Sequence, residues 1–127
     1  MREILFRGKQ ISDGGWVYGY PYSDGKKSYI AYEGKKDCII HEVVPETLKP
    51  YTGLTDKNGK MIFEGDIIKG KEKATYAIGY SDATAGFYAK ATLPQRILPC
   101  MNIGTMKHYE VIGNIHDNPE LMGGNQT

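Results

Sequence analysis

The stretch YTGLTDKNGKMIFEGDII, residues 51–68, holds two apolar runs separated by a turn. Asn58-Gly59 stands between the runs. An Asn-Gly pair in this position is the strongest short-range signal of a β-hairpin, because both central residues of a type I′ turn need positive φ. Gly65 then predicts a bulge or a sharp bend before the chain continues as a strand. The stretch therefore predicts antiparallel strands joined by a tight turn.

Working outward, the clearest alternation of period 2 runs through residues 16–22. It places aromatic side chains on one face and Val17, Gly19 and Pro21 on the other, as expected of a strand. Pro21 cannot donate to a ladder, so this strand is expected to end there or to lie at an edge. A turn at 23–26 predicts a hairpin with a return strand over 28–33, and a third strand is expected over 38–44.

The rest of the chain predicts further strands and a few helical turns. Strands are expected near 76–80, 86–91 and 108–115, the last with a break at Gly113. Proline at or before the first helical position favours short helical turns. Three such turns are expected, at 45–48, 95–98 and 118–121.

Composition supports a β protein. Sixteen of the 127 residues are glycine, against a usual share of about 7 per cent, and Ile and Tyr outnumber Leu and Ala, which favours sheet over helix. We expect one domain over residues 1–127 that is mainly β, with antiparallel strands in a curled sheet or a small partly open barrel and one to three short helical turns. The tail, residues 123–127, is expected to be disordered.

The charge balance and the apolar pattern exclude several classes of protein. Sixteen basic residues against 15 acidic ones give a net charge of +1, which argues against a phosphate-driven nucleic-acid binder and against an anionic-membrane anchor. No segment approaches the roughly 18 apolar residues of a membrane span. The start does not resemble a signal peptide, and two cysteines make no disulfide framework. A bacterial cytoplasmic protein with free thiols and no membrane partner is expected.

The residues that could bind a metal do not have metal-site spacing. Cys38 and His41 point to opposite faces of a strand, and no paired Cys-x-x-Cys motif joins Cys100, His108 or His116. We expect buried thiols, ordinary histidines, no metal and no cofactor.

Catalytic residues are not expected either. No serine or cysteine sits in a nucleophile-elbow setting, so the chain is not expected to be an enzyme. Glu64 and Asp66 are expected to be solvated or to bond turn amides.

The aromatic stripe is the one candidate binding site. It consists of the side chains on one face of the first predicted hairpin strand and the lysines in the turn after it: Trp16, Tyr18, Tyr20, Tyr22, Lys26 and Lys27. Aromatic side chains beside lysines can stack on single-stranded nucleic acid, and Tyr and Trp are also enriched in protein interfaces. The interpretation favoured over both is that this face is simply core or the rim of a barrel, because period-2 aromatics usually mark a half-buried sheet.

Three segments together resemble one known family. Residues 51–68 resemble the central signature of the YopX family, EVIGNIHDNPELM at 110–122 resembles its C-terminal signature, and REILFR at 2–7 is similar to its usual opening. The resemblance implies a mainly β structure and a phage or prophage origin. It implies no established activity and no catalytic or ligand residues.

The resulting hypothesis is a non-enzymatic phage or prophage accessory protein. An interaction module for another protein, including a second copy of itself in a homo-oligomer, ranks first. A single-stranded nucleic-acid binder ranks second, because aromatic and lysine residues cluster but the net charge is near zero. An enzyme of unknown class ranks third.

Overall fold

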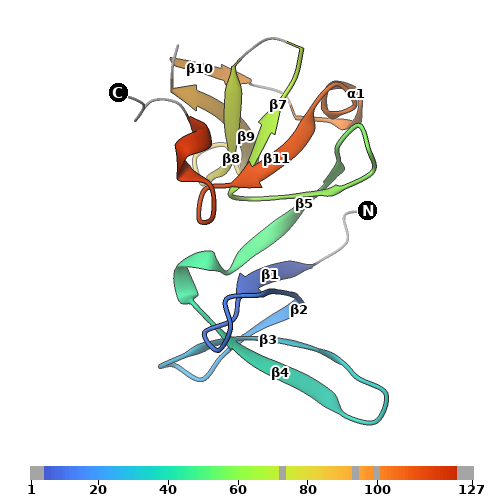
Figure 1. Cartoon of the computed structure of the whole chain (residues 1–127), viewed down its shortest axis with the longest axis vertical. Coiled ribbons are helices and arrows are strands. Elements are labelled where there is room, and N and C mark those ends of the chain that lie inside the picture. The colour runs from blue at the N-terminus through green and yellow to red at the C-terminus, as the bar shows by residue number, and fades with distance from the viewer. Residues whose placement is uncertain (1–4, 72–73, 93–94, 99–100, 123–127) are drawn as a thin grey trace. The chain divides into compact units, whose positions relative to one another are not determined.

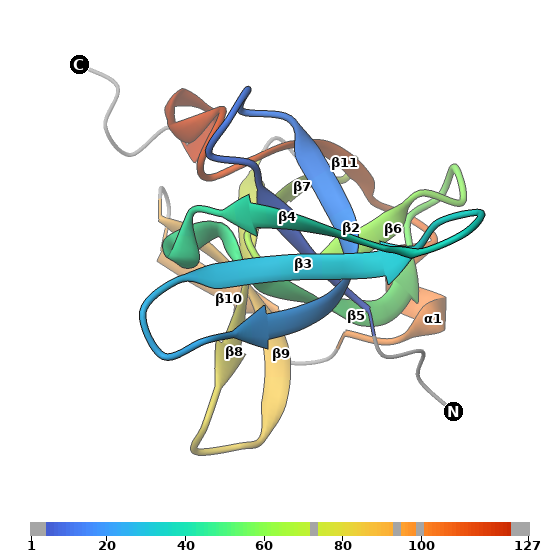
Figure 2. The same ribbon diagram turned by 90° about the horizontal axis from the view of Figure 1, so that it is seen from below.

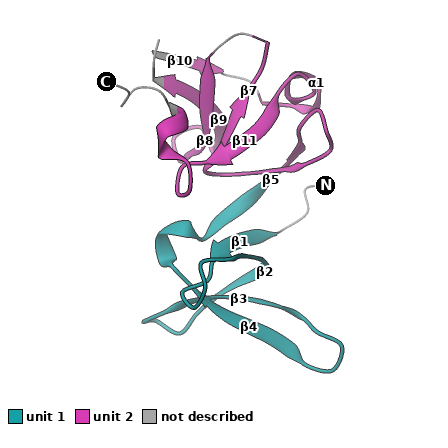
Figure 3. Ribbon diagram, viewed as in Figure 1, with its two compact units in different colours: residues 1–51 teal, residues 52–127 magenta. Residues whose placement is uncertain are grey.

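The computed structural model describes residues 5–71, 74–92, 95–98 and 101–122. The chain forms two compact units, Met1–Tyr51 and Thr52–Thr127, coloured separately in Figure 3. The tail predicted to be disordered, 123–127, lies outside the described residues. That one domain spans the chain stays a prediction.

The first unit is an antiparallel sheet with the strand order β4-β3-β2-β1-β5 (Figure 1). β5 starts in this unit and ends in the second. A single 3-10 turn, η1 (Pro45–Thr47), precedes β5 and confirms the helical turn expected at 45–48. The strands are β1 (Phe6–Lys9), β2 (Trp16–Ser23), β3 (Ser28–Glu33), β4 (Cys38–Val43) and β5 (Lys49–Thr55).

β2 changes partner halfway along its length. Its first half pairs with β1 as far as Gly19, and its second half pairs with β3 from Tyr20 onward. Gly19 is required at this junction, because a Cβ there would lie 2.3 Å from the backbone oxygen of Ala31. Pro21 does not end the strand: it lies opposite Ile30 in the half that pairs with β3. The predicted hairpin is therefore confirmed, with β2 running on to Ser23.

The core of the first unit is small and lies on one face of this sheet. Val17, Ile30 and Val43 are buried, and Phe6, Tyr32 and Leu48 pack against them. The absence of a side chain at Gly8 lets β1 lie close to Val43 of β4, because a Cβ at Gly8 would lie 2.9 Å from the Val43 side chain. One face of β2 therefore packs against apolar side chains at Val17 and Gly19, whereas Pro21 further along is exposed.

The second unit contains a five-stranded antiparallel sheet with the order β10-β9-β8-β7-β11. Its core draws on residues spread along the sequence of this unit. The buried residues are Ile62, Ile68, Tyr76, Ile78, Ala89, Ala91, Met106, Tyr109 and Val111. The remaining elements are β6 (Met61–Phe63), β7 (Asp66–Lys69), β8 (Thr75–Ser81), β9 (Gly86–Thr92), β10 (Gln95–Leu98), α1 (Ile103–Met106), β11 (Glu110–Asn114) and η2 (Pro119–Met122).

The hairpin at Asn58-Gly59 is confirmed, but its turn is not type I′. Gly59 has a φ of 82°, whereas Asn58 is not among the residues with positive φ. The Gly59 N–H donates to the Asp56 carbonyl at 3.0 Å, and the Asp56 N–H donates to the Lys60 carbonyl at 2.8 Å. This pattern is typical of a type I turn followed by one left-handed residue, which also needs glycine at only one position.

Asp56 ties that hairpin to β11. Its Oδ1 accepts hydrogen bonds from the N–H groups of Asn58 and Lys60 at 2.8 and 2.9 Å, and its Oδ2 accepts one from Val111 at 2.9 Å. Burial raises the pKa of Asp56, but these three bonds and the nearby Lys60 charge outweigh it and hold the pKa below its ordinary value. A buried carboxylate thus joins segments that are 55 residues apart in sequence.

The bends predicted at two glycines are confirmed. Gly65 has a φ of 94° between β6 and β7, and the Oδ2 of Asp66 accepts the Phe63 N–H at 2.7 Å. Asp66 is 1 per cent exposed, so of the two expected roles it bonds a turn amide and is not solvated. β11 carries a register shift between Val111 and Gly113, as a bulge would.

The helical turn expected at 95–98 is wrong. These residues form β10, which pairs in register with β9 from Gln95 opposite Thr92 to Leu98 opposite Ala89. The flanking prolines suggested a helix locally, but pairing with a neighbouring strand outweighs that preference. α1 was not predicted; Asn102 caps it by accepting the Thr105 N–H at 3.0 Å. η2 confirms the turn expected at 118–121. The mainly β, antiparallel fold class is confirmed, as two sheets not closed into a barrel among the described strands.

Candidate functional site

The aromatic stripe of β2 points away from the core. Tyr18, Tyr20 and Tyr22 are 44, 63 and 53 per cent exposed, whereas Val17 on the other face is 8 per cent exposed. Of the favoured interpretation, core or the rim of a barrel, the core part is therefore wrong for these three tyrosines. Alternation showed that β2 has two different faces, but the buried side is the one with Val17 and Gly19, because Ile30 and Val43 fill the core behind it.

Neighbouring strands extend this exposed surface. The rings of Tyr22 and Tyr29 lie 5.6 Å apart between centroids. Tyr20 lies opposite Ala31, which in turn lies opposite Ile40 of β4, and Ile40 is 54 per cent exposed. Figure 2 shows β3 and β4 side by side in this sheet. We call the surface formed by Tyr18, Tyr20, Tyr22, Tyr29 and Ile40 the tyrosine face.

Trp16 lies at one end of the tyrosine face and is half-buried. The Arg7 guanidinium carbon lies 4.6 Å from the centre of its ring, in cation–π contact. The pairing of β2 with β3 ends at Tyr20 and Ala31. Next to this end lies a recess of about 340 Å³, lined by Trp16, Val17, Tyr18 and Tyr32. The structure thus keeps Trp16 next to the tyrosines, as the sequence predicted, but with its ring already covered in part by Arg7.

The turn that carries the two candidate lysines is organised by Asp24. Its Oδ1 accepts the backbone N–H groups of Lys26 and Lys27 at 2.9 and 2.8 Å, and its Oδ2 accepts the Tyr29 hydroxyl at 3.2 Å. The Lys27 N–H and then the Lys26 N–H hold the pKa of Asp24 below its ordinary value. Desolvation, followed by the bond to Asp24, raises the pKa of Tyr29. The backbone N–H groups of Lys26 and Lys27 therefore stabilise the turn itself.

The charges beside the tyrosine face nearly cancel. The Lys27 ammonium lies 3.9 Å from a carboxylate oxygen of Glu42 on β4. Residues 1–51 contain eight basic and seven acidic side chains. The tyrosine face is accordingly aromatic and close to neutral, which favours binding by apolar contact and hydroxyl hydrogen bonds over binding to a phosphate backbone.

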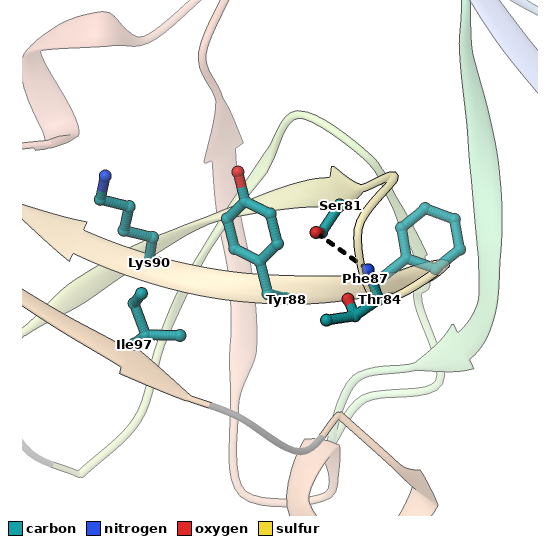
Figure 4. Close-up of a pocket in the computed structure, with 6 residues that line it drawn as sticks. All are labelled: Ser81, Thr84, Phe87, Tyr88, Lys90 and Ile97. Carbon is teal, nitrogen blue, oxygen red and sulfur yellow. Dashed lines mark hydrogen bonds between the residues drawn. The ribbon is translucent and has the colours of Figure 1, made fainter.

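A second concave surface, missed in the sequence, lies on the outer face of the sheet in the second unit (Figure 4). It has a volume of about 430 Å³ and is lined by Ser81, Thr84, Phe87, Tyr88, Lys90 and Ile97. Tyr88 lies over Gly79, where a Cβ would be 2.6 Å from the ring. The lining combines apolar and aromatic side chains with two hydroxyl groups and the Lys90 ammonium group. No signal could have found the pocket, because it depends on β10, which was expected to be helical.

The thiol and histidine positions that the structure describes do not form a metal site. Cys38 is exposed, so the expected burial of this thiol is wrong; Cys100 lies outside the described residues. The Nε2 of His41 lies 3.2 Å from the Tyr32 hydroxyl. Within ranges 5–71, 74–92, 95–98 and 101–122, no group of three or more His, Cys, Asp or Glu side chains is placed to hold a metal ion.

Comparison with known proteins identifies the family. The model of the family described as "YopX protein" matches residues 5–123. The fold is similar to that in the crystal structure of protein EF1440 from Enterococcus faecalis, with a TM-score of 0.59 and 23 per cent identity, over 96 per cent of this chain and 99 per cent of that chain. No curated protein matches. No helix among the described residues is long and apolar enough to cross a membrane. With its signatures at both the central hairpin and the C-terminal strand, the chain belongs to the YopX family.

Proposed function

We propose that this protein is a phage or prophage accessory protein that acts in the bacterial host cytoplasm without catalysis, by binding another protein through the tyrosine face. The observation that carries the proposal is the exposure of three tyrosines and Ile40 on one face of a hydrogen-bonded sheet. Tyr supplies a large amphipathic contact area at low entropic cost. A hydrogen-bonded sheet whose other face packs around Val17, Ile30 and Val43 holds these side chains in place for a partner.

The local charge supports a protein partner over nucleic acid. Lys27 is paired with Glu42, and the arginine nearest the stripe, Arg7, is 6 per cent exposed and stacked on Trp16. A single-strand binder needs basic groups along the path of the phosphates. The tyrosine face offers aromatic rings with few uncompensated cations beside them.

The test is capture of a partner from a lysate in which a resident prophage has been induced. The immobilised wild-type chain is compared with Tyr20→Ser/Tyr22→Ser and with a control, Met61→Ser/Ile103→Ser, which removes two exposed apolar side chains of the second unit. Each capture is run with and without nuclease. A protein retained after nuclease by the wild type and the control, but not by the tyrosine variant, supports the proposal. Equal retention by all three chains contradicts it.

A second candidate function is binding of single-stranded nucleic acid, which the grouping of Trp16 with three tyrosines favours. The tryptophan is the only one in the chain, so its fluorescence reports directly on this end of the face. A salt-sensitive change on titration with an oligonucleotide at micromolar strand would support this candidate. No change under those conditions removes it.

A further inference from the structure

The pocket of the second unit is built on three neighbouring strands. Its volume of about 430 Å³ lies within the range of small-molecule sites in proteins. Tyr88 and Lys90 stand two residues apart and therefore point to the same side of β9, as Figure 4 shows. Tyr88 lies opposite Gly79 of β8, and Lys90 lies opposite Ile97 of β10. Strand register thus positions the lining side chains, which makes them better placed for a ligand than side chains on a loop.

Gly79 determines where the Tyr88 ring lies. A Cβ at Gly79 would be 2.6 Å from the Cζ of Tyr88 and 2.7 Å from its hydroxyl oxygen. Because no side chain stands at Gly79, the far end of the ring reaches across to β8. The ring therefore leans away from β10, where Ile97 lines the pocket and is 54 per cent exposed.

Lys90 gives the pocket a positive charge that no carboxylate balances. Its side chain is half-buried, and within the described part of the chain its ammonium group makes no ion pair and no hydrogen bond. Of the described residues that line the pocket, none is acidic. An ammonium group that is partly removed from water is stabilised by an anion beside it, because charge-assisted hydrogen bonds are strong. This end of the pocket therefore favours one negatively charged group.

Hydroxyl groups line the other end of the pocket. Ser81 lies opposite Gly86, which is about 13 Å from Lys90 along β9. The Ser81 Oγ accepts the Thr84 N–H at 3.4 Å, the dashed line in Figure 4, so its proton remains available to an acceptor on a ligand. The Thr84 side chain adds a second hydroxyl. A single polar group cannot reach both ends, so the lining suits a ligand with polar groups at opposite ends of an apolar body.

We propose that this pocket binds a small aromatic carboxylate that carries a hydroxyl at the opposite end of its ring. The carboxylate accepts a hydrogen bond from the Lys90 ammonium group. The ring packs against Tyr88 and Ile97, since aromatic rings favour offset or edge-to-face contact, and the ligand hydroxyl accepts from Ser81. A single ammonium group matches the single charge of a carboxylate. This binding goes beyond the proposed role of the tyrosine face and uses residues of the second unit alone.

The test compares two ligands of the same shape, 4-hydroxyphenylacetate and its neutral analogue 4-hydroxyphenylacetamide. Each is titrated into the full chain and followed by the backbone amide signals in ¹H–¹⁵N correlation spectra. The acid has about eleven non-hydrogen atoms and is expected to bind with a Kd near 1 mM. It should shift the amides of residues 79–81, 86–90 and 97 in a saturable way. The neutral analogue should bind about tenfold more weakly, because it lacks the charge that Lys90 recognises.

Variants at residue 90 assign the charge effect. Lys90→Met keeps most of the apolar stem but removes the charge, so it should bind the acid as weakly as the wild type binds the neutral analogue. Lys90→Arg keeps a cation and should retain the preference for the acid. Lys69→Met, at an exposed lysine of β7 in the same sheet, is the matched control and should bind as the wild type does. The spectra themselves verify that each variant is folded.

Four results would overturn the assignment of this pocket. They are no saturable shift up to about 20 mM acid, equal affinity of the wild type for acid and neutral analogue, unchanged binding by Lys90→Met, and shifts confined to the tyrosine face. Tyr20→Ser/Tyr22→Ser should bind the acid with wild-type affinity. Failure of the tyrosine-face proposal and failure of this one can therefore be told apart.

Discussion

At the scale of single residues, Asp56 contributes more to the second unit than its place in a turn suggests. It is 5 per cent exposed and accepts three backbone hydrogen bonds, one of them from β11. Bonds to a charged acceptor are stronger than neutral ones, and a buried N–H left without a partner is costly. The carboxylate is therefore expected to stabilise the hairpin and its attachment to β11 together.

We expect Asp56→Ala to lower the free energy of unfolding by about 3 kcal/mol and Asp56→Asn by about half as much, since the amide keeps one acceptor oxygen. Urea unfolding at neutral pH measures both. Asp82→Asn, an exposed carboxylate in the turn between β8 and β9, is the control and should change little.

The pH dependence follows from the lowered pKa of Asp56. The stabilisation is present in full above the ordinary pKa of 3.8 and is lost as the pH falls below it through the lowered pKa of the folded state. The stability difference between the wild type and Asp56→Asn should therefore shrink as the pH is lowered through this window. A difference that stays constant down to strongly acidic pH would show that the charge on Asp56 is not what stabilises the hairpin.

At the scale of elements, the central hairpin could close with either of two turn types, and the sequence alone does not choose between them. The type I turn with one left-handed residue needs glycine only at Gly59, whose φ is 82°. Gly59→Ala is expected to cost about 1–2 kcal/mol, whereas Asn58→Ala should cost less than about 0.5 kcal/mol as an ordinary surface change. Thermal or urea unfolding of the two variants decides between the turns. A type I′ turn would make both substitutions costly.

The change of partner in β2 is a second feature at this scale. A Cβ at Gly19 would lie 2.3 Å from the Ala31 carbonyl oxygen, and backbone cannot move aside as a side chain can. Gly19→Ala is expected to lower the free energy of unfolding by about 2–3 kcal/mol, in the range of overpacked cores, and to speed amide exchange where β2 pairs with β3. Gly86→Ala is the matched control, because the nearest atom to its Cβ would be 3.7 Å away. Equal effects of the two substitutions would contradict the close approach at Gly19.

The elements that could be predicted are those with a strong local signal. The hairpins at 16–33 and 51–63 carry turn residues at the right spacing, and the alternation of β2 needs no tertiary information. β10 could not be predicted, because its strand character comes from pairing with β9 and not from its own residues. The direction of burial in β2 escaped prediction for a related reason: tyrosine suits either side of a sheet, and the core residues that decide the side, Ile30 and Val43, lie on other strands.

At the scale of the whole molecule, two compact units carry two different surfaces. The first presents the tyrosine face, and the second presents the pocket beside Tyr88 and Lys90. Of the candidate residues chosen from the sequence, Tyr18, Tyr20 and Tyr22 lie on one exposed surface. Tyr29 and Ile40 joined them only through strand register, which a single sequence does not specify.

Binding of a protein partner by the tyrosine face is tested by the affinity of the captured partner for Tyr20→Ser/Tyr22→Ser. Loss of two anchoring tyrosines at about 1.4 kcal/mol or more each predicts binding weaker by about 100-fold or more. The Met61→Ser/Ile103→Ser control should bind as the wild type does. A double tyrosine variant that binds with wild-type affinity, or a control that weakens binding as much, would contradict the claim.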